Sequence, residues 1–241
     1  IISAAVIIVL LVSVVLATIL YFNKKNIYNI FEYRKKTTNA MAHDLKTPLA
    51  IASLYVANLK ENLNDPEKSS KHADEIDDSI SYMNKLVNNI LEFSNSESDT
   101  AIKKESLDIR TEINNYISSI EANLQSRQLS VAISGDAKIT TDKKLWNQAI
   151  TNLIDNAIKY TSAPSIDINI TDKEVSISNS VESDISNVSD LKEPFVKGDS
   201  ERGENTGSGL GLSIADNNLK HLGYKLDVSC VDKKFIAKIK M

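Results

Sequence analysis

The stretch 152-NLIDNAIKYT-161 ends a segment, residues 142–160, whose pattern predicts a helix. Apolar residues recur in this segment at steps of four, so one side of the helix can lie against a sheet: Leu145, Ala149, Leu153 and Ala157. Runs of alternating apolar and polar residues occur on both sides of the segment and predict the strands of that sheet. The pattern therefore favours an α+β domain in which helices cover a sheet.

The predicted strands and the remaining helices extend over the second half of the chain. The strands are expected at residues 129–134, 166–170, 174–178, 225–231 and 235–239, with a short strand-like SLDI at 106–109. Further helices are expected at residues 110–125 and 210–222. The irregular stretch 179–208 is too long for a simple connector, and such loops are usually lids or disordered segments.

The polar side of the 152–161 stretch has a composition that suits a nucleotide. Asn152, Asn156, Lys159 and Tyr160 fall within one arc of the predicted helix. An Asn side-chain oxygen is a hard ligand for Mg²⁺, and a Lys ammonium is a point charge for phosphate. The arc can hold a magnesium triphosphate, although an ordinary polar helix face would look similar.

Glycine is concentrated in and before the stretch 204-ENTGSGLGLSIADN-217. Five of the seven glycines of the chain lie between Gly198 and Gly211. Gly207, Gly209 and Gly211 alternate with other residues and lead into a helical pattern. Glycine permits close approach of the backbone to a ligand, and the N–H groups of a helix start can face an anion. A flexible loop is the alternative interpretation.

The first half of the chain predicts a helical hairpin. Residues 27–59 and 67–93 have helical patterns, and Asn64-Asp65-Pro66 separates them, with Asp65 as N-cap and Pro66 at the first helical position. The second helix has an apolar heptad seam: Ile76, Ile80, Met83, Val87 and Ile90. Two helices with one apolar stripe each bury little alone, so we expect a homodimer that forms a four-helix bundle.

The stretch 41-MAHDLKTPLA-50 places a histidine away from the apolar side of the first helix. The apolar seam runs through Met41, Leu45, Pro48 and Ala52. At about 100° per residue, His43 lies on the outer face. Asp44 can orient or deprotonate the imidazole, and Thr47 follows one turn later on the same face. A solvated face with a helix-kinking proline is the plain alternative.

The N-terminus predicts a membrane span. Residues 1–22 contain no charge, two serines and one threonine, and reach the length that a spanning helix needs. A signal peptide would need a basic start and a small-residue cleavage site. The following residues, 23–36, are rich in Lys and Arg, which predicts that everything downstream is cytoplasmic. Because the chain opens at Ile1 rather than Met, we expect a preceding part to be missing.

Composition excludes several classes of protein. The 241 residues have 42% hydrophobic and 25% charged content, which argues for folded domains. The net charge of -4 gives no indication of nucleic-acid binding. Cys230 is the single cysteine, so the chain has no disulfide framework and suits a reducing compartment.

From about residue 37 to its end, the chain resembles the sensor histidine kinases of bacterial two-component systems. Three motifs occur in the family's order: H-D-L-K-T-P from His43, N-L-x-x-N-A-x-K-Y over residues 152–160, and G-x-G-L-G-L over residues 207–212. The patterns described above predict a transmembrane helix at 1–22 and a helical linker at 23–36. The resemblance implies a dimerisation and phosphotransfer domain at 37–98 and an α+β sandwich ATP-binding domain of the GHKL type at 104–241. Residues 179–208 would form its lid.

The resemblance also implies roles for individual residues. His43 would be the phosphoacceptor, Asp44 its general base, and Thr47 the residue that positions water when the kinase works as a phosphatase. Asn156, helped by Asn152, would ligate Mg²⁺. The nucleotide would be held by the remaining motif residues and by two cations of the lid: Lys159, Tyr160, Asn179, Lys197, Arg202, Gly207, Gly209, Leu210 and Gly211.

The implied function is a homodimeric kinase of the bacterial cell membrane with a cytoplasmic catalytic part. It would phosphorylate His43 from Mg-ATP, pass the phosphoryl group to an aspartate of a response regulator receiver domain, and contact lipid through its N-terminal helix. Stimulus, regulator, the balance of kinase and phosphatase, and transfer within or between subunits stay open. No nucleic-acid partner is expected.

One departure from the family concerns the adenine site. The family's Asp-x-Gly-x-Gly motif is replaced by 179-NSVES-183, in which Asn179 keeps an acceptor oxygen but has no charge. A phosphatase-only or pseudokinase sensor is therefore an alternative. A GHKL ATPase of the chaperone or topoisomerase kind is another, but such a protein needs neither the exposed histidine nor a span. About 20 residues separate the span from His43, so we expect one helix to run directly into the bundle.

Overall fold

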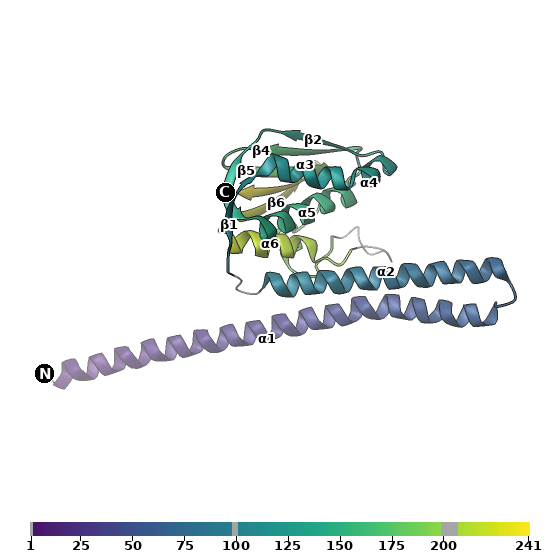
Figure 1. Cartoon of the computed structure of the whole chain (residues 1–241). Helices are drawn as coiled ribbons and strands as arrows, with labels where there is room; N and C mark the ends of the chain where they lie inside the picture. Colours follow the sequence, from purple (N-terminus) through teal and green to yellow (C-terminus); the bar gives the residue numbers. More distant parts are fainter. Residues whose placement is uncertain (1, 98–100, 199–206) are drawn as a thin grey trace.

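A computed structural model of the chain describes residues 2–97, 101–198 and 207–241, with the side chains of residues 2–10, 12 and 13 excluded. A long helical hairpin occupies one side of the molecule, and an α/β domain lies over its second helix (Figure 1). The chain is thus divided as the sequence predicts, into an all-helical unit followed by a mixed one.

The hairpin consists of two antiparallel helices of unequal length. Helix α1, Ile2–Glu61, has 60 residues, and helix α2, Pro66–Ser96, has 31. Asp65 caps α2 by accepting a hydrogen bond from the Lys68 N–H at 3.2 Å, as predicted. Pro48 lies within α1 and does not end it. The N-terminal segment therefore continues without a break into the helix of His43, and α1 extends beyond the end of α2 (Figure 1).

The predicted membrane span falls largely on residues whose side chains are outside the described set. In the part of the chain that the structure describes, no helix combines the length and the apolar character needed to cross a membrane.

Helix α2 has two apolar seams rather than the predicted single one. Ser79, Leu86 and Phe93 recur at steps of seven and are buried. Ile80 and Val87, which the sequence places in the same seam as Ile76, are exposed. The prediction merged two neighbouring stripes, because their spacing along the sequence is identical. Only packing against α1 shows which stripe is covered within one chain.

The second unit is built on a five-stranded sheet in the order β2-β4-β5-β7-β6. Strand β2 runs parallel to β4, and the other neighbours are antiparallel. The strands are Ser130–Ser134 (β2), Ser165–Ile170 (β4), Glu174–Ser180 (β5), Lys225–Val231 (β6) and Lys234–Lys240 (β7). Each of the five was predicted, with ends that differ by at most two residues.

A small second sheet pairs β1, Lys104–Asp108, with β3, Lys138–Asp142. Sequence reasoning missed β3, because Ile139 is its only large apolar residue and no alternation is visible. Ile139 lies opposite Leu107 in the antiparallel register, which explains the pairing. Asp142 ends β3 and caps the next helix through bonds from the Lys144 and Leu145 N–H groups, at 3.0 and 3.2 Å.

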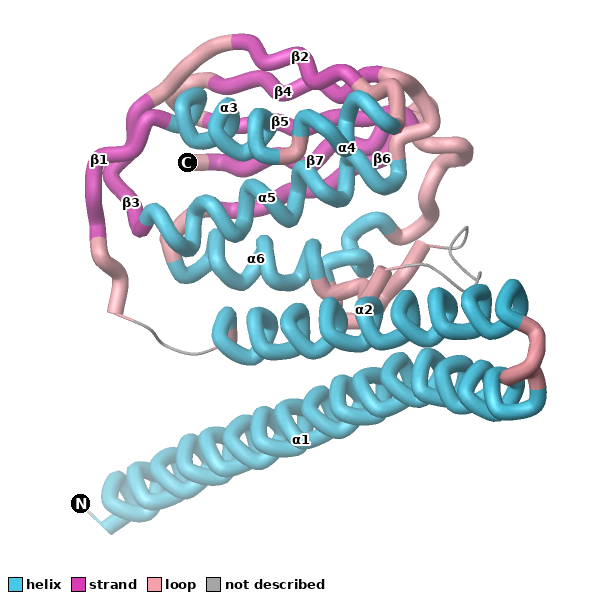
Figure 2. The backbone as a smooth tube through the Cα atoms, turned by 45° about the vertical axis from the view of Figure 1, so that its right-hand side comes forward, coloured by secondary structure: helices cyan, strands magenta, loops and turns pink. Residues whose placement is uncertain are grey.

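Helices cover one face of the large sheet (Figures 1 and 2). They are α3 (Ile109–Ser119), α4 (Glu121–Ser126), α5 (Lys143–Tyr160) and α6 (Gly211–His221). The single helix predicted at 110–125 is divided at Ile120, whose φ of -111° leaves the helical region. A short 3₁₀ helix, Val188–Lys192, lies in the predicted lid, of which residues 199–206 are outside the described set.

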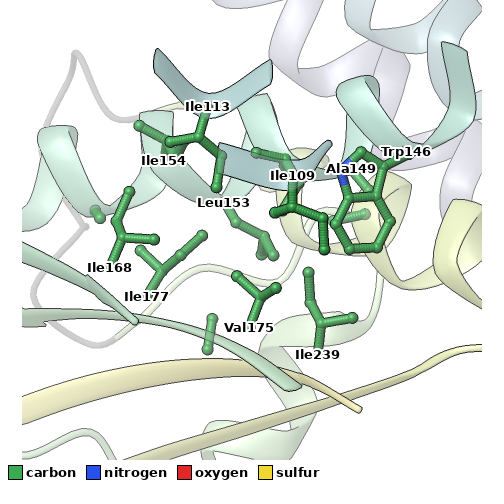
Figure 3. Close-up of a cluster of buried hydrophobic side chains, with 14 of the residues drawn as sticks. Ile109, Ile113, Trp146, Ala149, Leu153, Ile154, Ile168, Val175, Ile177 and Ile239 are labelled. Carbon is green, nitrogen blue, oxygen red and sulfur yellow. The ribbon is translucent and has the colours of Figure 1, made fainter. Parts of the chain in front are cut away.

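The core lies between these helices and the sheet (Figure 3). Leu153 and Ala149 of α5 face Val175 and Ile177 of β5, and Trp146 is fully buried at the start of α5. The alternation of β4 and β5 sends every second side chain into this layer, as their period of two requires. The predicted contact of α5 with the sheet is confirmed.

Candidate functional site

His43 stands on the outer face of α1, away from the α2 interface. Its side chain is 80% exposed, whereas that of Asp44 is 17% exposed. Pro48 and Ala52 of the predicted seam are buried and Met41 is half-buried, so the helical phase predicted from the sequence is correct. Thr47 is exposed one turn after His43, on the same side.

The contact between His43 and Asp44 defines which ring nitrogen is reactive. Nδ1 of His43 lies 3.4 Å from Oδ1 of Asp44. A carboxylate in this position keeps a proton on Nδ1, so the lone pair resides on Nε2. In this tautomer Nε2 is the ring nitrogen that can act as a nucleophile.

The amides of α5 meet the start of α6. A Cβ atom placed on Gly211 would lie 3.1 Å from Oδ1 of Asn152 and 3.7 Å from Oδ1 of Asn156. Asn152 donates through Nδ2 to the Gln148 carbonyl at 2.8 Å, which turns its oxygen towards α6. The two amide oxygens thus converge beside a helix N-terminus, an arrangement that the sequence alone did not reveal.

The cation of α5 lies beside the first glycine of the motif. A Cβ atom on Gly207 would collide with Nζ of Lys159. That ammonium donates to the Tyr160 hydroxyl at 2.7 Å and lies 4.6 Å from the centre of the Tyr160 ring. The backbone at Gly207 therefore passes close to a charged group, and a side chain at this position would displace the Lys159 ammonium.

Gly209 fixes the turn that starts α6. Its φ is +66°, and a Cβ atom would lie 3.0 Å from the Phe195 backbone. The Gly209 carbonyl accepts a hydrogen bond from the Phe195 N–H at 3.0 Å. Leu210 is completely buried, and no described side chain caps the helix that follows. The first N–H groups of α6 are therefore available to an anion.

Asn179 lies at the end of β5 on the face that carries Val175 and Ile177, and it is 3% exposed. It donates through Nδ2 to the Ser180 carbonyl at 3.1 Å. The Val181 N–H, where the family has its first glycine, donates to the Lys233 carbonyl at 2.8 Å. The segment is thus an ordered strand end. Asn179 opens towards the helix layer, as an adenine ligand would.

Of the two cations predicted in the lid, the structure describes Lys197 alone. Lys197 does not stand beside the α5 amides: its Nζ lies 3.2 Å from Oδ2 of Asp44. Arg202 lies outside the described residues. Asp44 therefore contacts His43 with one oxygen and Lys197 with the other.

The hairpin and the ATPase domain meet in an interface, called the joint below, near the contact of Lys197 with Asp44. Sequence reasoning missed this interface. Phe93, Leu210 and Ile214 form a buried cluster, against which Met41, Ile90 and Phe195 pack. Asn89 donates to Ser208 Oγ at 3.2 Å, and Asn217 donates to Ser96 Oγ at 3.3 Å. Helix α6 lies along α2 in both views (Figures 1 and 2). The sequence places Met41 and Ile90 in apolar seams, but nothing in the local pattern indicates that the ATPase domain packs near them.

Two tyrosines show the effects of burial near carboxylates. Burial, and then Glu97 and Glu193, raise the pKa of Tyr33 on α1. Burial, and then its hydrogen bond to Asp155, raise the pKa of Tyr116. Both phenols stay protonated at neutral pH. The hydrogen bond of Tyr33 with Glu97 joins α1 to the end of α2.

The described residues contain no group of three or more His, Cys, Asp or Glu side chains that could hold a metal ion. Asn152 and Asn156 fall outside that class of ligand, and their oxygens fit a magnesium ion that is also coordinated by phosphate. The donor set beside the α6 N-terminus therefore suits Mg-ATP.

Comparison with known families agrees with the two units. The family model of the His Kinase A (phospho-acceptor) domain matches residues 33–99. The model of the histidine kinase-, DNA gyrase B- and HSP90-like ATPases matches residues 141–241. The chain belongs to the sensor histidine kinases of two-component systems.

Individual relatives support this assignment. The chain is 30% identical over 209 residues to the Autoinducer 2 sensor kinase/phosphatase LuxQ of Vibrio vulnificus, covering 78% of this chain and 24% of that protein. It is 25% identical over 211 residues to the sensor histidine kinase YkoH of Bacillus subtilis, covering 82% and 45%. The chain thus spans less than half the length of these relatives.

Two solved structures share the fold. The histidine kinase AdeS of Acinetobacter baumannii matches with a TM-score of 0.66 and 20% identity, over 83% of this chain and 96% of that chain. The histidine kinase ThkA, solved in complex with the response regulator protein TrrA, matches with a TM-score of 0.70 and 19% identity, over 88% and 63%.

Proposed function

We propose that the protein is a membrane-bound sensor kinase that phosphorylates His43 from Mg-ATP and passes the phosphoryl group to an aspartate of a response regulator. The observation that carries the proposal is the exposed imidazole with Asp44 at its Nδ1. A solvated histidine has no structural reason to be oriented by a half-buried carboxylate. A nucleophile that must meet a phosphorus atom does.

The nucleotide would bind between α5 and α6. Asn152 and Asn156 would offer amide oxygens to the magnesium ion, and the free N–H groups of α6 would face the phosphates. Lys159 would add a positive charge, and Asn179 would accept a hydrogen bond from the adenine amino group. Bound Mg-ATP supplies the γ-phosphoryl group and neutralises its charge.

The residues of α1 would then carry out the transfer. The Nε2 lone pair of His43 forms the bond to phosphorus, while the bond to the β,γ-bridging oxygen breaks and ADP leaves with that electron pair. Asp44 holds the Nδ1 proton and stabilises the positive charge that the ring acquires. Phosphoryl transfer needs chiefly alignment and charge neutralisation, which these groups provide.

The later steps would involve a receiver domain. His43 and Thr47 lie on one exposed face, where a second protein can reach both. The structure of ThkA was solved with a response regulator protein, which makes such a partner reasonable here. Thr47 would orient water for dephosphorylation of that partner.

Dimerisation through the hairpin would complete its core. The described residues of the hairpin leave an apolar stripe uncovered on both helices: Leu49, Val56, Ile80, Val87 and Leu91. Leu49 and Val56, like Ile80 and Val87, are seven residues apart, which is the repeat of a coiled-coil seam. A second copy of the same stripe would bury both in a four-helix bundle.

Location in the cell membrane rests on the sequence. Residues 1–22 have no charge, and the basic residues that follow would place the catalytic part in the cytoplasm. The uninterrupted α1 would then connect the membrane to His43 as one rigid element.

One further candidate is a sensor that only dephosphorylates its regulator. Asn179 in place of an acidic adenine ligand favours it, because an amide attracts the adenine amino group less strongly than a carboxylate does.

The deciding experiment incubates the whole chain in detergent with Mg²⁺ and γ-labelled ATP, beside His43→Ala. We expect label that is acid-labile and base-stable in the unaltered chain and none in the variant. Folded, dimeric protein that binds ATP but takes up no label would support the phosphatase. Label that survives in His43→Ala would contradict the proposed acceptor.

A further inference from the structure

The ATPase domain reaches the phosphoacceptor helix of its own chain. Lys197 and Asp44 form an ion pair with 3.2 Å between Nζ and Oδ2, although 153 positions separate them in the sequence. Their side chains are 26% and 17% exposed, so the pair is largely shielded from water. Such a pair is worth more than the usual surface contact, because solvent screens it less.

A second, apolar contact also involves residues of α1 and of the ATPase domain in the same chain. Met41, half a turn before His43, packs against the cluster formed by Phe93, Leu210 and Ile214. Leu210 directly precedes Gly211, the residue that abuts the amides of α5. Met41 of α1 and Leu210 at the start of α6 thus belong to one apolar cluster within a single chain.

We propose that, within the dimer, each ATPase domain phosphorylates His43 of its own subunit. Lys197 is the positioning residue that holds the domain against α1 of its own chain, through Asp44; this placement is called the intrachain register. The inference rests on the proposed kinase function and specifies which subunit serves as acceptor. It also gives Lys197 a task other than the phosphate contact that the sequence suggests.

The geometry around Asp44 explains how Lys197 acts. One carboxylate oxygen is taken by Lys197 and the other faces Nδ1 of His43. The ion pair therefore restricts rotation of the carboxylate and holds the imidazole in the orientation that exposes Nε2. Docking of the domain and preparation of the nucleophile become a single event, because the same carboxylate takes part in both.

Mixed dimers test which subunit is labelled. The unaltered chain is combined with an Asn156→Ala chain that carries a second affinity tag and a larger size, and dimers with both tags are isolated and given Mg²⁺ and γ-labelled ATP. We expect label on the unaltered chain alone, since only that chain has both a complete nucleotide site and its own His43. Label on the Asn156→Ala chain would overturn the proposal.

Variants of Lys197 test its task. We expect Lys197→Met to slow the transfer step by about 10- to 100-fold while the dissociation constant for Mg-ATP is unchanged, and Lys197→Arg to restore most of the rate. Lys144→Met, which removes an equally charged but exposed side chain of α5, is the matched control. Weaker Mg-ATP binding with an unchanged rate of transfer would assign Lys197 to the phosphates and overturn its positioning role.

Different outcomes would contradict the kinase function and the intrachain transfer. If homodimers of the unaltered chain take up no acid-labile label, the kinase function itself is wrong. If they do and the mixed dimers are labelled on the partner chain, the kinase stands and the intrachain register is wrong.

Discussion

The hairpin and the ATPase domain bury their apolar side chains in different ways. The ATPase domain encloses a core of Trp, Ile, Leu and Val side chains between helices and sheet (Figure 3). In the described part of the hairpin, the buried apolar side chains are Pro48, Ala52, Leu86 and Phe93, and Phe93 packs against the ATPase domain. One unit is complete within a single chain, and the other leaves an apolar stripe uncovered.

We infer from this difference that the ATPase domain serves the chemistry and that the hairpin serves regulation. A closed core is densely packed and holds the nucleotide ligands at fixed distances. A hairpin whose apolar stripe would be covered by a second copy, and whose contact with the ATPase domain is small, can change its packing at lower cost. The conformational freedom of the molecule is therefore expected in the bundle and in the joint, and much less in the ATP site.

The largest expected effect is a cavity in the closed core. Leu153 is 2% exposed, and Leu153→Ala should lower the free energy of unfolding of the ATPase domain by about 3 kcal/mol. Fluorescence of Trp146, the only tryptophan, reports this transition in denaturant. The loss should be the same at every protein concentration. Dependence on concentration would show that the domain is not self-sufficient.

The same substitution in the hairpin should behave differently. Leu49 is 57% exposed, so Leu49→Ala should leave the unfolding of the ATPase domain unchanged. It should weaken the dimer by about 2 kcal/mol per subunit, because an apolar side chain is lost from the interface. Sedimentation at several concentrations measures this, with the exposed Lys60→Ala on the same helix as control. An unaltered dimer would place the interface elsewhere.

The joint between the units should respond less. Asn89→Ala removes the 3.2 Å hydrogen bond to Ser208 and should weaken docking of the ATPase domain by about 1 kcal/mol. The rate of limited proteolysis of the native protein, which should rise when the ATPase domain undocks, gives the measurement. Asn88→Ala, at an exposed neighbouring position, is the control and should have no effect. Equal cleavage of the Asn89→Ala and Asn88→Ala variants would show that Asn89 does not stabilise the joint.

The smallest effect concerns a surface ion-pair network of the closed unit. Hydrogen bonds from Lys240 and then Lys225 lower the pKa of Asp227 to about 2. This is below the pKa of about 3.9 that an unfolded Asp has, so the network stabilises the fold above about pH 4. Its contribution is lost as the pH falls towards 2. Asp227→Asn should cost about 0.5 kcal/mol at pH 7. Denaturation at several pH values should show this difference shrinking in acid, and a constant difference would contradict the assignment.

Much of the fold was readable from local patterns. The five strands of the large sheet, the Asp65 cap and the helical phase of His43 follow from periodicity and from capping chemistry, which act over a few residues. Strand β3 was not readable, because its stability comes from pairing with β1 rather than from its own composition. The break at Ile120 was missed since no glycine or proline marks it.

The candidate site was likewise readable from the sequence only in part. The residue types at His43, Asp44, Asn152 and Asn156 gave the chemistry, because metal, phosphate and proton ligands need particular functional groups. The approach of Gly211 to both amides came only with the structure. The position of Lys197 is the clearest case: the resemblance to related kinases suggested a phosphate contact, and the fold places its ammonium beside Asp44.

The sequence by itself determined the helical hairpin and the layered ATPase domain, and it supplied the proposed nucleophile and the proposed nucleotide ligands, since each depends on residue identity and on spacing within one element. Tertiary structure alone decided which seam of α2 is covered and where the two units meet. It also decided that Lys197 forms its ion pair with Asp44 of α1. Those outcomes depend on contacts between residues up to 153 positions apart, and no local pattern encodes the energy of such contacts.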